Sequence, residues 1–303
     1  MKFNKLFHTQ FNSRVNIASQ DIFNLEKSKS IFELSSSNLI FKYKPVVTIA
    51  DPFLFVDDDR LYLFYEEQVS LGGKGVIKMR WTTDLVNWSF PITVLKESFH
   101  LSYPNVFKFN DCVYMMPETG SDKSVRLYKP NNDFTQWTLY KTILSNKKYV
   151  DSSIIFKDNI YFLFTTLCED NKYKLMLFCS EKIDGKYELH PKSPIAIGNN
   201  NGRCGGSVFE YEGKLYRPTQ ICENYYAEGL KINEILFLTK NNYSEKYLKT
   251  IIPNNDEFYS LGGHHFSFVF FKEEIIIATD GLSLSLNFWE VGRRVHRKLK
   301  GLV

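Results

Sequence analysis

The sequence predicts an all-β protein, a five-bladed β-propeller with four-stranded antiparallel blades. The main observation is a hairpin phrase that recurs five times at intervals of roughly fifty residues. Each copy has an apolar run, a tight polar turn and a second run rich in β-branched and aromatic residues, which is typical of a β-hairpin. Repeats of this length with several strands each indicate a propeller or a solenoid, and five in 303 residues favour a closed ring. The copies span residues 51–67, 103–118, 151–166, 205–220 and 265–280.

The remaining predicted strands follow the hairpins along the chain. A third strand is expected after each hairpin, at residues 74–81, 124–128, 174–179, 232–238 and 284–289. A turn and an outer strand follow in segments with spaced Asp, Trp or Tyr residues, at 83–88, 132–137 and 181–187, a pattern typical of propeller blades. We therefore expect an N-terminal extension over 1–45, with a candidate ring-closing strand at Ile40-Phe41, the propeller over 46–290 and a basic tail over 291–303.

The composition limits the compartment and the classes of partner. Hydrophobic residues make up 44% of the chain, which is ordinary for a globular protein with a real core. The net charge of +4 is too small to indicate nucleic-acid binding. Five cysteines occur singly, with no Cys-x-x-Cys pair, which suits a reducing compartment. Since the start has no long apolar run and no stretch reaches transmembrane length, we expect a cytoplasmic protein.

The basic tail offers one further prediction. From Phe288 onward, apolar residues recur on one helical stripe and the basic residues lie elsewhere. A basic amphipathic helix can lie on an anionic membrane, so peripheral membrane contact is one interpretation. The alternative is a solvated terminal helix packed on the propeller. The stripe consists of Phe288, Val291, Val295 and Leu299.

Aligning the tyrosine of the second strand of each hairpin sets a common register for the repeats. It places Asp51, Tyr103, Asp151, Gly205 and His265 at the start of successive innermost strands. Because a hairpin folds back on itself, the end of the second strand lies on the same face as the start of the first. In each repeat, the start of the first strand, the end of the second strand and the neighbouring segments carry polar side chains. These side chains converge on one concave centre, which indicates a ligand site. The residues predicted to contact substrate are Glu67, His100, Tyr103, Thr166, Arg203, Arg217, Gln220, His264, His265 and Asp280.

Alternation along the strands restricts these assignments. Adjacent residues of a strand point to opposite faces, so Glu66 and Glu67 cannot both face the centre, and neither can His264 and His265. No third ligand has a sensible spacing from the histidine pair, so we expect neither a metal nor another cofactor. Asp51 before Pro and Asp151 before Ser-Ser could instead cap local turns.

Two phrases carry a family resemblance. Asp51-Pro52 at the start of the first repeat and Asp151-Ser152 at the start of the third resemble the furanosidase superfamily of five-bladed propellers, glycoside hydrolase families 32, 43 and 68. The resemblance implies that Asp51 is a nucleophile or general base. It also implies that Asp151 stabilises the transition state or tunes a pKa.

Four further phrases are closer to another group. They resemble the propeller domain of plant glucosamine inositolphosphorylceramide transferases and of related bacterial proteins of polysaccharide biosynthesis. The phrases are His100-Leu-Ser-Tyr-Pro104, Pro117-Glu-Thr119, Gly202-Arg-Cys-Gly-Gly206 and Leu215-Tyr-Arg-Pro-Thr-Gln220.

One departure from the hydrolases shapes the functional prediction. Where they carry an acidic Glu at the start of the fourth blade, this chain has Arg203-Cys204-Gly205. A glycoside leaving group needs a proton, whereas a nucleotide-linked sugar leaves as a phosphate and needs positive charge, which Arg203 and Arg217 could supply. Glu118 is the candidate replacement acid and completes the predicted catalytic set of Asp51, Asp151 and Glu118.

The leading hypothesis is a glycosyltransferase that moves a sugar, plausibly a furanose such as fructose, from a nucleotide-linked donor onto a surface polysaccharide or glycolipid precursor. The alternatives are an intracellular furanoside hydrolase and a non-catalytic glycan-binding propeller.

Overall fold

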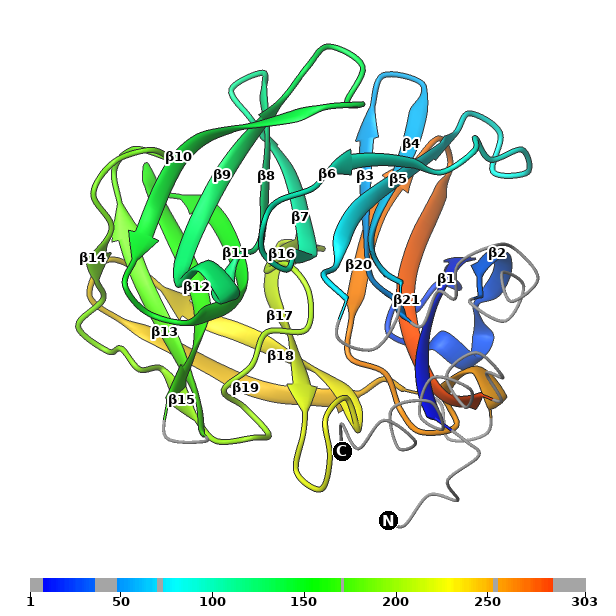
Figure 1. Cartoon of the computed structure of the whole chain (residues 1–303). Coiled ribbons are helices and arrows are strands. Elements are labelled where there is room, and N and C mark those ends of the chain that lie inside the picture. Colours follow the sequence, from blue (N-terminus) through cyan, green and yellow to red (C-terminus); the bar gives the residue numbers. More distant parts are fainter. Residues whose placement is uncertain (1–7, 36–47, 70–72, 170–171, 253–255, 286–303) are drawn as a thin grey trace, which may run out of the picture.

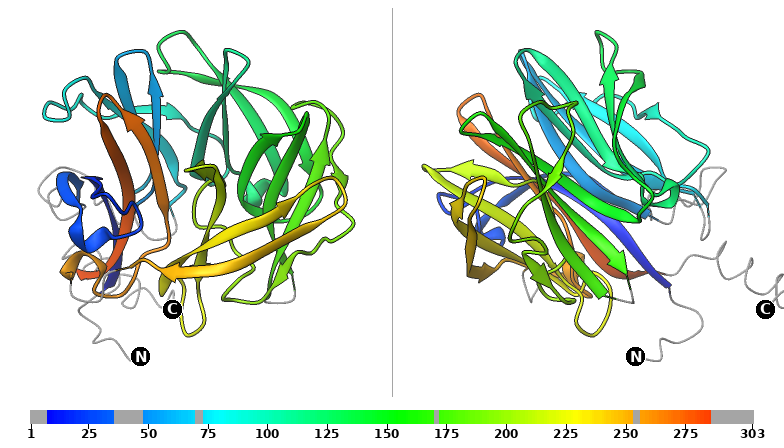
Figure 2. Two further views of the ribbon diagram at one scale, coloured as in Figure 1. Left: turned by 180° about the vertical axis from the view of Figure 1, so that it is seen from behind. Right: turned by 90° about the vertical axis from the view of Figure 1, so that its left-hand side faces the viewer.

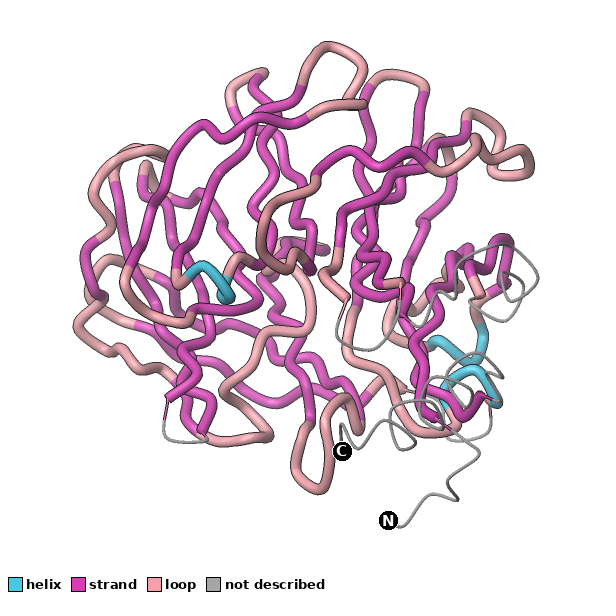
Figure 3. The backbone as a smooth tube through the Cα atoms, in the orientation of Figure 1, coloured by secondary structure: helices cyan, strands magenta, loops and turns pink. Residues whose placement is uncertain are grey.

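The computed structural model describes residues 8–35, 48–69, 73–169, 172–252 and 256–285, and it consists of strands almost throughout (Figure 1). Helical structure in these ranges is limited to short 3₁₀ turns, which appear in cyan in Figure 3. No helix in the described ranges has the length and apolar character needed to cross a membrane. The all-β prediction is confirmed. The turns are η1 (Leu25–Lys27), η3 (Gly120–Asp122) and η4 (Glu257–Tyr259).

Three sheets of the described chain are antiparallel meanders of consecutive strands, as the repeat predicts. The first has the order β10-β9-β8-β7, with β7 (Ser102–Phe109), β8 (Cys112–Glu118), β9 (Ser124–Pro130) and β10 (Trp137–Ser145). The next contains β11 (Tyr149–Lys157), β12 (Ile160–Glu169), β13 (Lys172–Ser180) and β14 (Glu188–Leu189), with β15 (Ala196–Ile197) beside β13. The last contains β16 (Phe209–Tyr211), β17 (Lys214–Ile221), β18 (Gly229–Leu238) and β19 (Tyr243–Thr250).

The remaining strands form one eight-stranded sheet. One half is a meander of β3 (Thr48–Asp57), β4 (Arg60–Gln68), β5 (Val76–Thr82) and β6 (Ile92–Leu95). The other half consists of β20 (Phe266–Phe271), β21 (Glu274–Ser285), β1 (His8–Ile17) and β2 (Lys29–Leu34). A single parallel pair, Phe11 with Thr48, joins the halves. Because this pair merges two four-stranded halves into one sheet, hydrogen bonding defines four sheets and not five. The predicted count of five blades and the ring closure therefore stay predictions.

The N-terminal strand takes the third place in the last repeat. β1 pairs antiparallel with β21 from His8–Ser285 to Ile17–Ile276. The sequence predicted a third strand at 284–289, but β21 continues to Ser285 as the second strand, and 286–303 lie outside the described residues. The candidate ring-closing strand at Ile40-Phe41 and the basic tail at 291–303 also lie outside them.

The segments with spaced Asp and Trp residues are turns that precede the outer strands, not the strands themselves. Asp84 Oδ1 accepts the backbone N–H groups of Val86 (2.9 Å) and Asn87 (2.7 Å), and β6 begins only at Ile92. Likewise β10 begins at Trp137. Asp and Asn favour such turns because their short side chains bond to nearby backbone groups, which competes with strand pairing.

Aromatic side chains fill the space between neighbouring sheets, which explains most of the aromatic content. Phe53 of β3 meets Tyr103 of β7 edge-on, with ring centroids 4.8 Å apart. Phe109 and Tyr161 make the same contact between β7 and β12 at 4.9 Å. Figures 1 and 2 show the sheets arranged around a central region, where β3 packs against β7 and β20. The starts of the first strands therefore meet at this centre.

Candidate active site

Three first strands carry the same backbone irregularity near their start. Asp51 in β3, Tyr103 in β7 and Asp151 in β11 all have positive φ angles, of 52°, 47° and 50°. At each position the pairing register slips by one residue, which is a β-bulge. A non-glycine residue in this left-handed region costs about 1–2 kcal/mol, and such strain gathers at functional sites. The bulges occur at the positions that the tyrosine alignment made equivalent.

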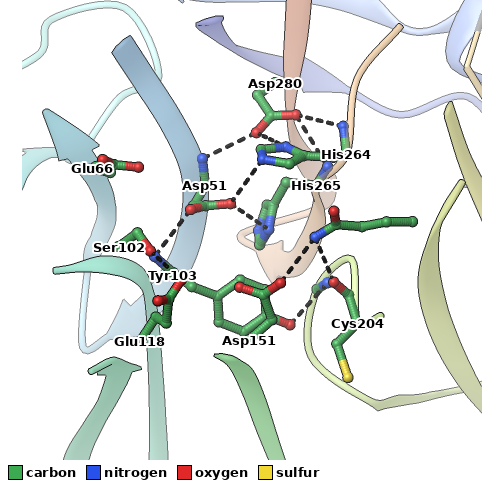
Figure 4. A network of polar contacts seen from close by, with 12 residues as sticks. Asp51, Glu66, Ser102, Tyr103, Glu118, Asp151, Cys204, His264, His265 and Asp280 are labelled. Carbon is green, nitrogen blue, oxygen red and sulfur yellow. Dashed lines mark hydrogen bonds and ion pairs between the residues drawn. The ribbon is translucent and has the colours of Figure 1, made fainter. Parts of the chain in front are cut away.

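The bulges border a central pocket of about 240 Å³, and Figure 4 shows the polar contacts among the residues around it. It combines residues from six of the strands (β1, β3, β4, β7, β8 and β11) and from the loops between strands. Six of the predicted site residues line it: Asp51, His100, Glu118, Asp151, Arg203 and His264. The other lining residues are Phe11, Thr48, Ala50, Glu66, Gln68, Ser102 and Tyr226.

Asp51 lies in the pocket wall with its carboxylate nearly sealed from solvent. Its Oδ2 accepts the backbone N–H of Tyr103 at 3.1 Å. Its Oδ1 lies 3.8 Å from His264 Nε2 and 3.7 Å from His265 Nδ1. Burial raises the pKa of Asp51 to about 7, although the nearby His264 opposes this rise. Asp51 is therefore poised to exchange a proton near neutral pH.

Asp280 lies behind the pocket lining and holds Asp51, His264 and His265 in place through its carboxylate. Its Oδ1 accepts the backbone N–H groups of His264 (2.8 Å) and His265 (3.1 Å), and its Oδ2 accepts that of Asp51 (3.1 Å). The same Oδ2 lies 2.6 Å from His264 Nδ1. Burial lowers the pKa of His264, but the Asp280 carboxylate outweighs burial and the net pKa is raised. The Asp280 carboxylate therefore favours the protonated form of His264, whose Nε2 faces Asp51.

We expect Asp280→Ala to destabilise the fold strongly. The substitution leaves a buried imidazole and three backbone N–H groups without their acceptor, and breaking a buried ion pair costs about 3–5 kcal/mol. The free energy of unfolding from denaturant titration measures the loss. Glu188→Ala, at an exposed carboxylate, is the matched control and should change stability by less than about 0.5 kcal/mol. Equal effects of the two substitutions would contradict the role of Asp280.

Asp51, His264 and Asp280 also form the one cluster within the described ranges whose ligand atoms gather closely enough, within 4.8 Å of one another, to hold a metal ion. Imidazole and carboxylate are common ligands of divalent metals. In this structure His264 Nδ1 and Asp280 Oδ2 contact each other directly at 2.6 Å, so the cluster is held together by its own side chains. The absence of a metal stays a prediction.

Asp151 lies on the opposite side of the pocket and is bound by two side chains. Arg203 Nε donates to its Oδ2 at 2.5 Å, and Gln220 Nε2 donates to the same oxygen at 3.2 Å. Arg203 in turn donates from Nη1 to the hydroxyl of Tyr173 at 3.2 Å and lies over the ring of Tyr226, 4.8 Å from its centroid. Arg203 therefore anchors Asp151 while its guanidinium still lines the pocket.

Two glutamates complete the ring of pocket carboxyls. Glu118 Oε2 accepts the Ser102 hydroxyl at 2.9 Å. Burial raises the pKa of Glu118 to about 7, and the Asp151 carboxylate adds to the rise. Burial also raises the pKa of Glu66 well above its usual value, with Asp51 and Glu118 adding to the effect. Like charges in one desolvated site oppose one another's ionisation, so the protonation of Asp51, Glu66 and Glu118 is coupled.

His100 and Gly75 position Glu66. The Gly75 N–H donates to His100 Nδ1 at 2.9 Å, so the ring proton is on Nε2, which lies 3.5 Å from Glu66 Oε1. A Cβ at Gly75 would lie 2.3 Å from the Leu101 carbonyl and 2.6 Å from Glu66 Oε1. Only glycine permits this close approach.

The structure corrects two substrate-binding predictions. Glu67 faces away from the pocket and pairs with Lys78 at 3.0 Å, whereas Glu66 pairs in register with Ala50, next to Asp51. Arg217 is fully buried in a two-pronged ion pair with Glu245, at 2.8 and 2.6 Å, and does not line the pocket. Arg217 and Gln220 lie three residues apart on β17 and therefore face opposite sides of the strand.

Three further predicted contacts are structural supports beneath the pocket. His265 packs edge-on against Phe53, 4.3 Å between ring centroids, and burial lowers its pKa to about 3. The Tyr103 hydroxyl accepts the Gly206 N–H at 3.0 Å, and the Thr166 hydroxyl accepts the Cys204 N–H at 3.3 Å. All three lie outside the pocket lining, because their side chains are buried in the packed centre. Gln220 and Asp280 likewise lie behind the lining and act on Asp151 and Asp51.

Comparison with known proteins identifies the family. Residues 34–264 match the family model of the N-terminal part of glucosamine inositolphosphorylceramide transferase 1. The chain belongs to this family. The glucosamine inositolphosphorylceramide transferase 1 proteins of Oryza sativa subsp. japonica and Arabidopsis thaliana are 36% and 35% identical to it over 204 residues, or 65% of this chain. The match covers 27% and 26% of these relatives, so the chain spans about a quarter of their length.

Solved structures show that the family shares its fold with glycoside hydrolases. The α-L-arabinofuranosidase PaAbf62A of Podospora anserina has a TM-score of 0.59 at 9% identity, covering 80% of this chain and 93% of the enzyme. Zg3597 of Zobellia galactanivorans, a family 117 glycoside hydrolase, has a TM-score of 0.56 at 11% identity. The match covers 93% of this chain and 92% of Zg3597. The family 43 glycoside hydrolase BlXynB of Bacillus licheniformis has a TM-score of 0.55 at 13% identity. The match covers 75% of this chain and 50% of BlXynB. The predicted resemblance is confirmed.

In this family member, sequence reasoning missed two aromatic lining residues. Phe11 comes from β1 and stacks on His264 with centroids 4.6 Å apart and an interplanar angle of 17°. Tyr226 meets the edge of the same imidazole at 5.2 Å. Neither lies in a repeated hairpin, so the repeat carried no signal for them. Glu66 could have been found, since it was already on the predicted rim.

Proposed function

We propose that this family member is a glycosyltransferase that moves a sugar from an activated, nucleotide-linked donor onto a polysaccharide or glycolipid precursor. The observation that carries the proposal is the convergence of Asp51, Glu118 and Asp151 on one pocket of about 240 Å³. This volume suits a single sugar ring better than a drug-sized ligand, for which pockets begin at about 300 Å³. The curated relatives are named as transferases, which supports transfer over hydrolysis.

The proposed reaction assigns one role to each aspartate. The bond between the anomeric carbon and the donor phosphate oxygen breaks, and the phosphate leaves with the bonding electrons. Asp51 either removes the proton of the acceptor hydroxyl as it attacks, or first attacks the anomeric carbon itself. Asp151 carries negative charge beside the oxocarbenium character that develops, and Arg203 holds it in place at 2.5 Å.

The finer parts of the proposal rest on the shared fold. A furanose donor sugar such as fructose is supported by the likeness to an α-L-arabinofuranosidase. A five-bladed ring, with β1 as the strand that joins the chain ends, is the architecture we propose for the four hydrogen-bonded sheets. We also propose a cytoplasmic location, with the basic tail at 291–303 making peripheral contact with an anionic membrane.

A furanoside hydrolase is the second candidate, and Glu118 favours it. A buried carboxyl with a pKa of about 7 can be protonated at neutral pH and can donate to a sugar leaving group. It would replace the acid that is missing at Arg203-Cys204-Gly205.

The direct test supplies the purified chain with nucleotide sugars plus a glycan or glycolipid acceptor, and separately with nitrophenyl furanosides in water. Under the proposed function, a new glycoside forms in the first reaction and its formation needs Asp51. Nitrophenol release without any transfer product would instead establish the hydrolase. No turnover of either class, together with glycan binding, would contradict both enzymatic candidates.

We expect kcat/KM with a nucleotide sugar to rise with pH through a midpoint near 7. The midpoint of this rise should lie near pH 7 because Asp51 must be ionised to act as a base, and burial raises its pKa to about 7. The midpoint belongs to the coupled carboxyl cluster as a whole. Initial rates between pH 5 and 9 measure it. A midpoint near 4 would contradict the assignment, and a bell-shaped profile would indicate that a protonated Glu118 is also needed.

A further inference from the structure

A second, larger pocket adjoins the central one. It has a volume of about 650 Å³ and shares Glu118, Arg203 and Tyr226 with the central pocket. We call it the outer pocket. Its walls come from the start of β11, the hairpin of β12 and β13, and the loop between β17 and β18. A ligand larger than one sugar ring would extend from the central pocket into the outer pocket.

The outer pocket has free positive charge. Lys148 and Lys172 line it, and neither makes an ion pair with the described residues. The Arg203 guanidinium lies at the junction with the central pocket. Three carboxyls also line it: Glu169 is paired with Lys174 at 2.8 Å, burial raises the pKa of Glu118 to about 7, and Glu223 keeps its charge although it accepts from the neutral Asn200 amide at 2.9 Å.

Backbone pairing keeps the two lysines in place at the rim. The carbonyl of Lys148 accepts the N–H of Cys168 at 3.1 Å, one residue before β11 begins. Lys172 is the first residue of β13 and pairs in register with Glu169. Both ammonium groups are therefore carried on the ends of paired strands and can reach a ligand in the outer pocket.

Aromatic rings form the rest of the wall. Tyr225 and Tyr226 are 42% and 43% exposed, which is high for neighbouring tyrosines in a pocket wall. Tyr173 adds a third ring, whose hydroxyl is fixed by Arg203 at 3.2 Å. Exposed tyrosines offer flat faces on which a base or a sugar ring can stack.

We propose that the outer pocket binds a phosphate group of the substrate through Lys148 and Lys172, while the transferred sugar occupies the central pocket. The central pocket is less suited to an anion: its basic residues Arg203 and His264 already contact Asp151 and Asp280. Four carboxyls also line it: Asp51, Glu66, Glu118 and Asp151. An anionic group is attracted instead to the next available cations, and those lie in the outer pocket. The inference rests on the proposed function and replaces Arg217, which is paired with Glu245, as the phosphate contact.

Two sources could supply this phosphate, the diphosphate of a nucleotide-linked donor or the phosphoinositol headgroup of a lipid acceptor. Isothermal titration of the full chain with uridine diphosphate and with inositol phosphate separates them. Uridine and inositol serve as phosphate-free counterparts. Tighter binding of uridine diphosphate assigns the outer pocket to the donor, and tighter binding of inositol phosphate assigns it to the acceptor.

The double variant Lys148→Gln/Lys172→Gln tests the residues. We expect its affinity for the preferred phosphate probe to fall on the order of tenfold or more, and the remaining affinity to depend less on salt. Lys147→Gln is the matched control, because Lys147 is exposed and adjacent but does not line the outer pocket. Its affinity should stay within about twofold.

Three results would overturn the inference: no binding of either phosphate probe to the unsubstituted chain, equal affinity in the double variant, or a preferred phosphate probe that binds no more tightly than its own phosphate-free counterpart. The titration needs no turnover, so its failure leaves the proposed function intact. Failure of the proposed function appears separately, as the absence of Asp51-dependent turnover.

Discussion

Asp51→Asn is expected to abolish turnover and to raise the melting temperature of the protein at pH 8. The substitution keeps the shape of the side chain and an oxygen that can accept the Tyr103 N–H. It removes the charge that serves as nucleophile or base. It also removes the need to ionise a buried carboxyl, because burial raises the pKa of Asp51 to about 7. Active-site groups of this kind commonly exchange stability for activity.

The sign of the pH dependence follows from the direction of the shift. The pKa of Asp51 is about 7 in the folded chain against 3.8 in its ordinary state, so between these values the unfolded chain releases its proton first. Ionisation then favours unfolding, and stability falls as pH rises from about 4 to about 7. Above pH 8 the full penalty is on the order of 4 kcal/mol. The gain from Asp51→Asn should therefore be largest at pH 8 and vanish near pH 4.

Thermal melts of the two proteins at pH 4, 6 and 8, together with initial rates, test both parts. Asp158→Asn is the matched control, since its side chain is 72% exposed and it should change neither rate nor melting temperature. Turnover of Asp51→Asn within a few fold of the unsubstituted chain would refute the catalytic assignment. The gain in melting temperature of Asp51→Asn over the unsubstituted chain should grow from pH 4 to pH 8. A gain that shrinks over this range would contradict the raised pKa of Asp51.

Glu118→Gln should have an effect that depends on the leaving group of the donor. With an alkyl furanoside, the departing oxygen needs a proton, so loss of the acid should reduce turnover about 10²–10⁴-fold. With a nucleotide sugar, the phosphate departs without a proton and we expect turnover within about tenfold. Glutamine preserves the size of the side chain and can still accept the Ser102 hydroxyl. The measurement is kcat on both donors for both proteins.

The comparison distinguishes the two candidate functions. A variant that is inactive with nucleotide sugars would contradict a phosphate leaving group and favour the hydrolase. Glu67→Gln is a suitable control, because Glu67 lies near the end of β4, which is the counterpart of β8 in the preceding hairpin, but pairs with Lys78 instead of lining the pocket. Arg203→Ala is less informative, since the buried Asp151 carboxylate would lose its 2.5 Å partner under either function.

Much of the fold could be predicted because its signals are local. An apolar run, a polar turn and a second apolar run specify a hairpin wherever they occur, and the repeat every fifty or so residues multiplies that evidence. The same register brought Asp51 and Asp151 to equivalent strand starts, where the structure has matching bulges. The segments with spaced Asp and Trp predict a turn together with the outer strand, but the outer strands β6 and β10 begin only at Ile92 and Trp137, because spacing alone does not tell a capped turn from the strand that follows it.

The site was predictable only where a side chain's direction follows from its own strand. Whether Glu66 or Glu67 faces the pocket depends on the register between β3 and β4, which the bulge in β3 shifts by one residue. The sequence pattern alone does not give that register. Arg217 carries the right charge for a phosphate, but its partner Glu245 comes from β19, 28 residues away in the chain. Such pairings depend on which strands become neighbours, and hairpin patterns do not encode that.

By itself, the sequence determined the strand repeat, the all-β class and the convergence of acidic side chains from separate repeats. Only the tertiary structure decided which side chains face the pocket, and it brought Phe11 from the N-terminal strand against His264. It also decided how protons are shared, because the raised pKa values of Asp51 and Glu118 come from burial and from neighbouring charges. Local patterns fix backbone hydrogen bonding, whereas desolvation and charge coupling arise only when distant segments pack together.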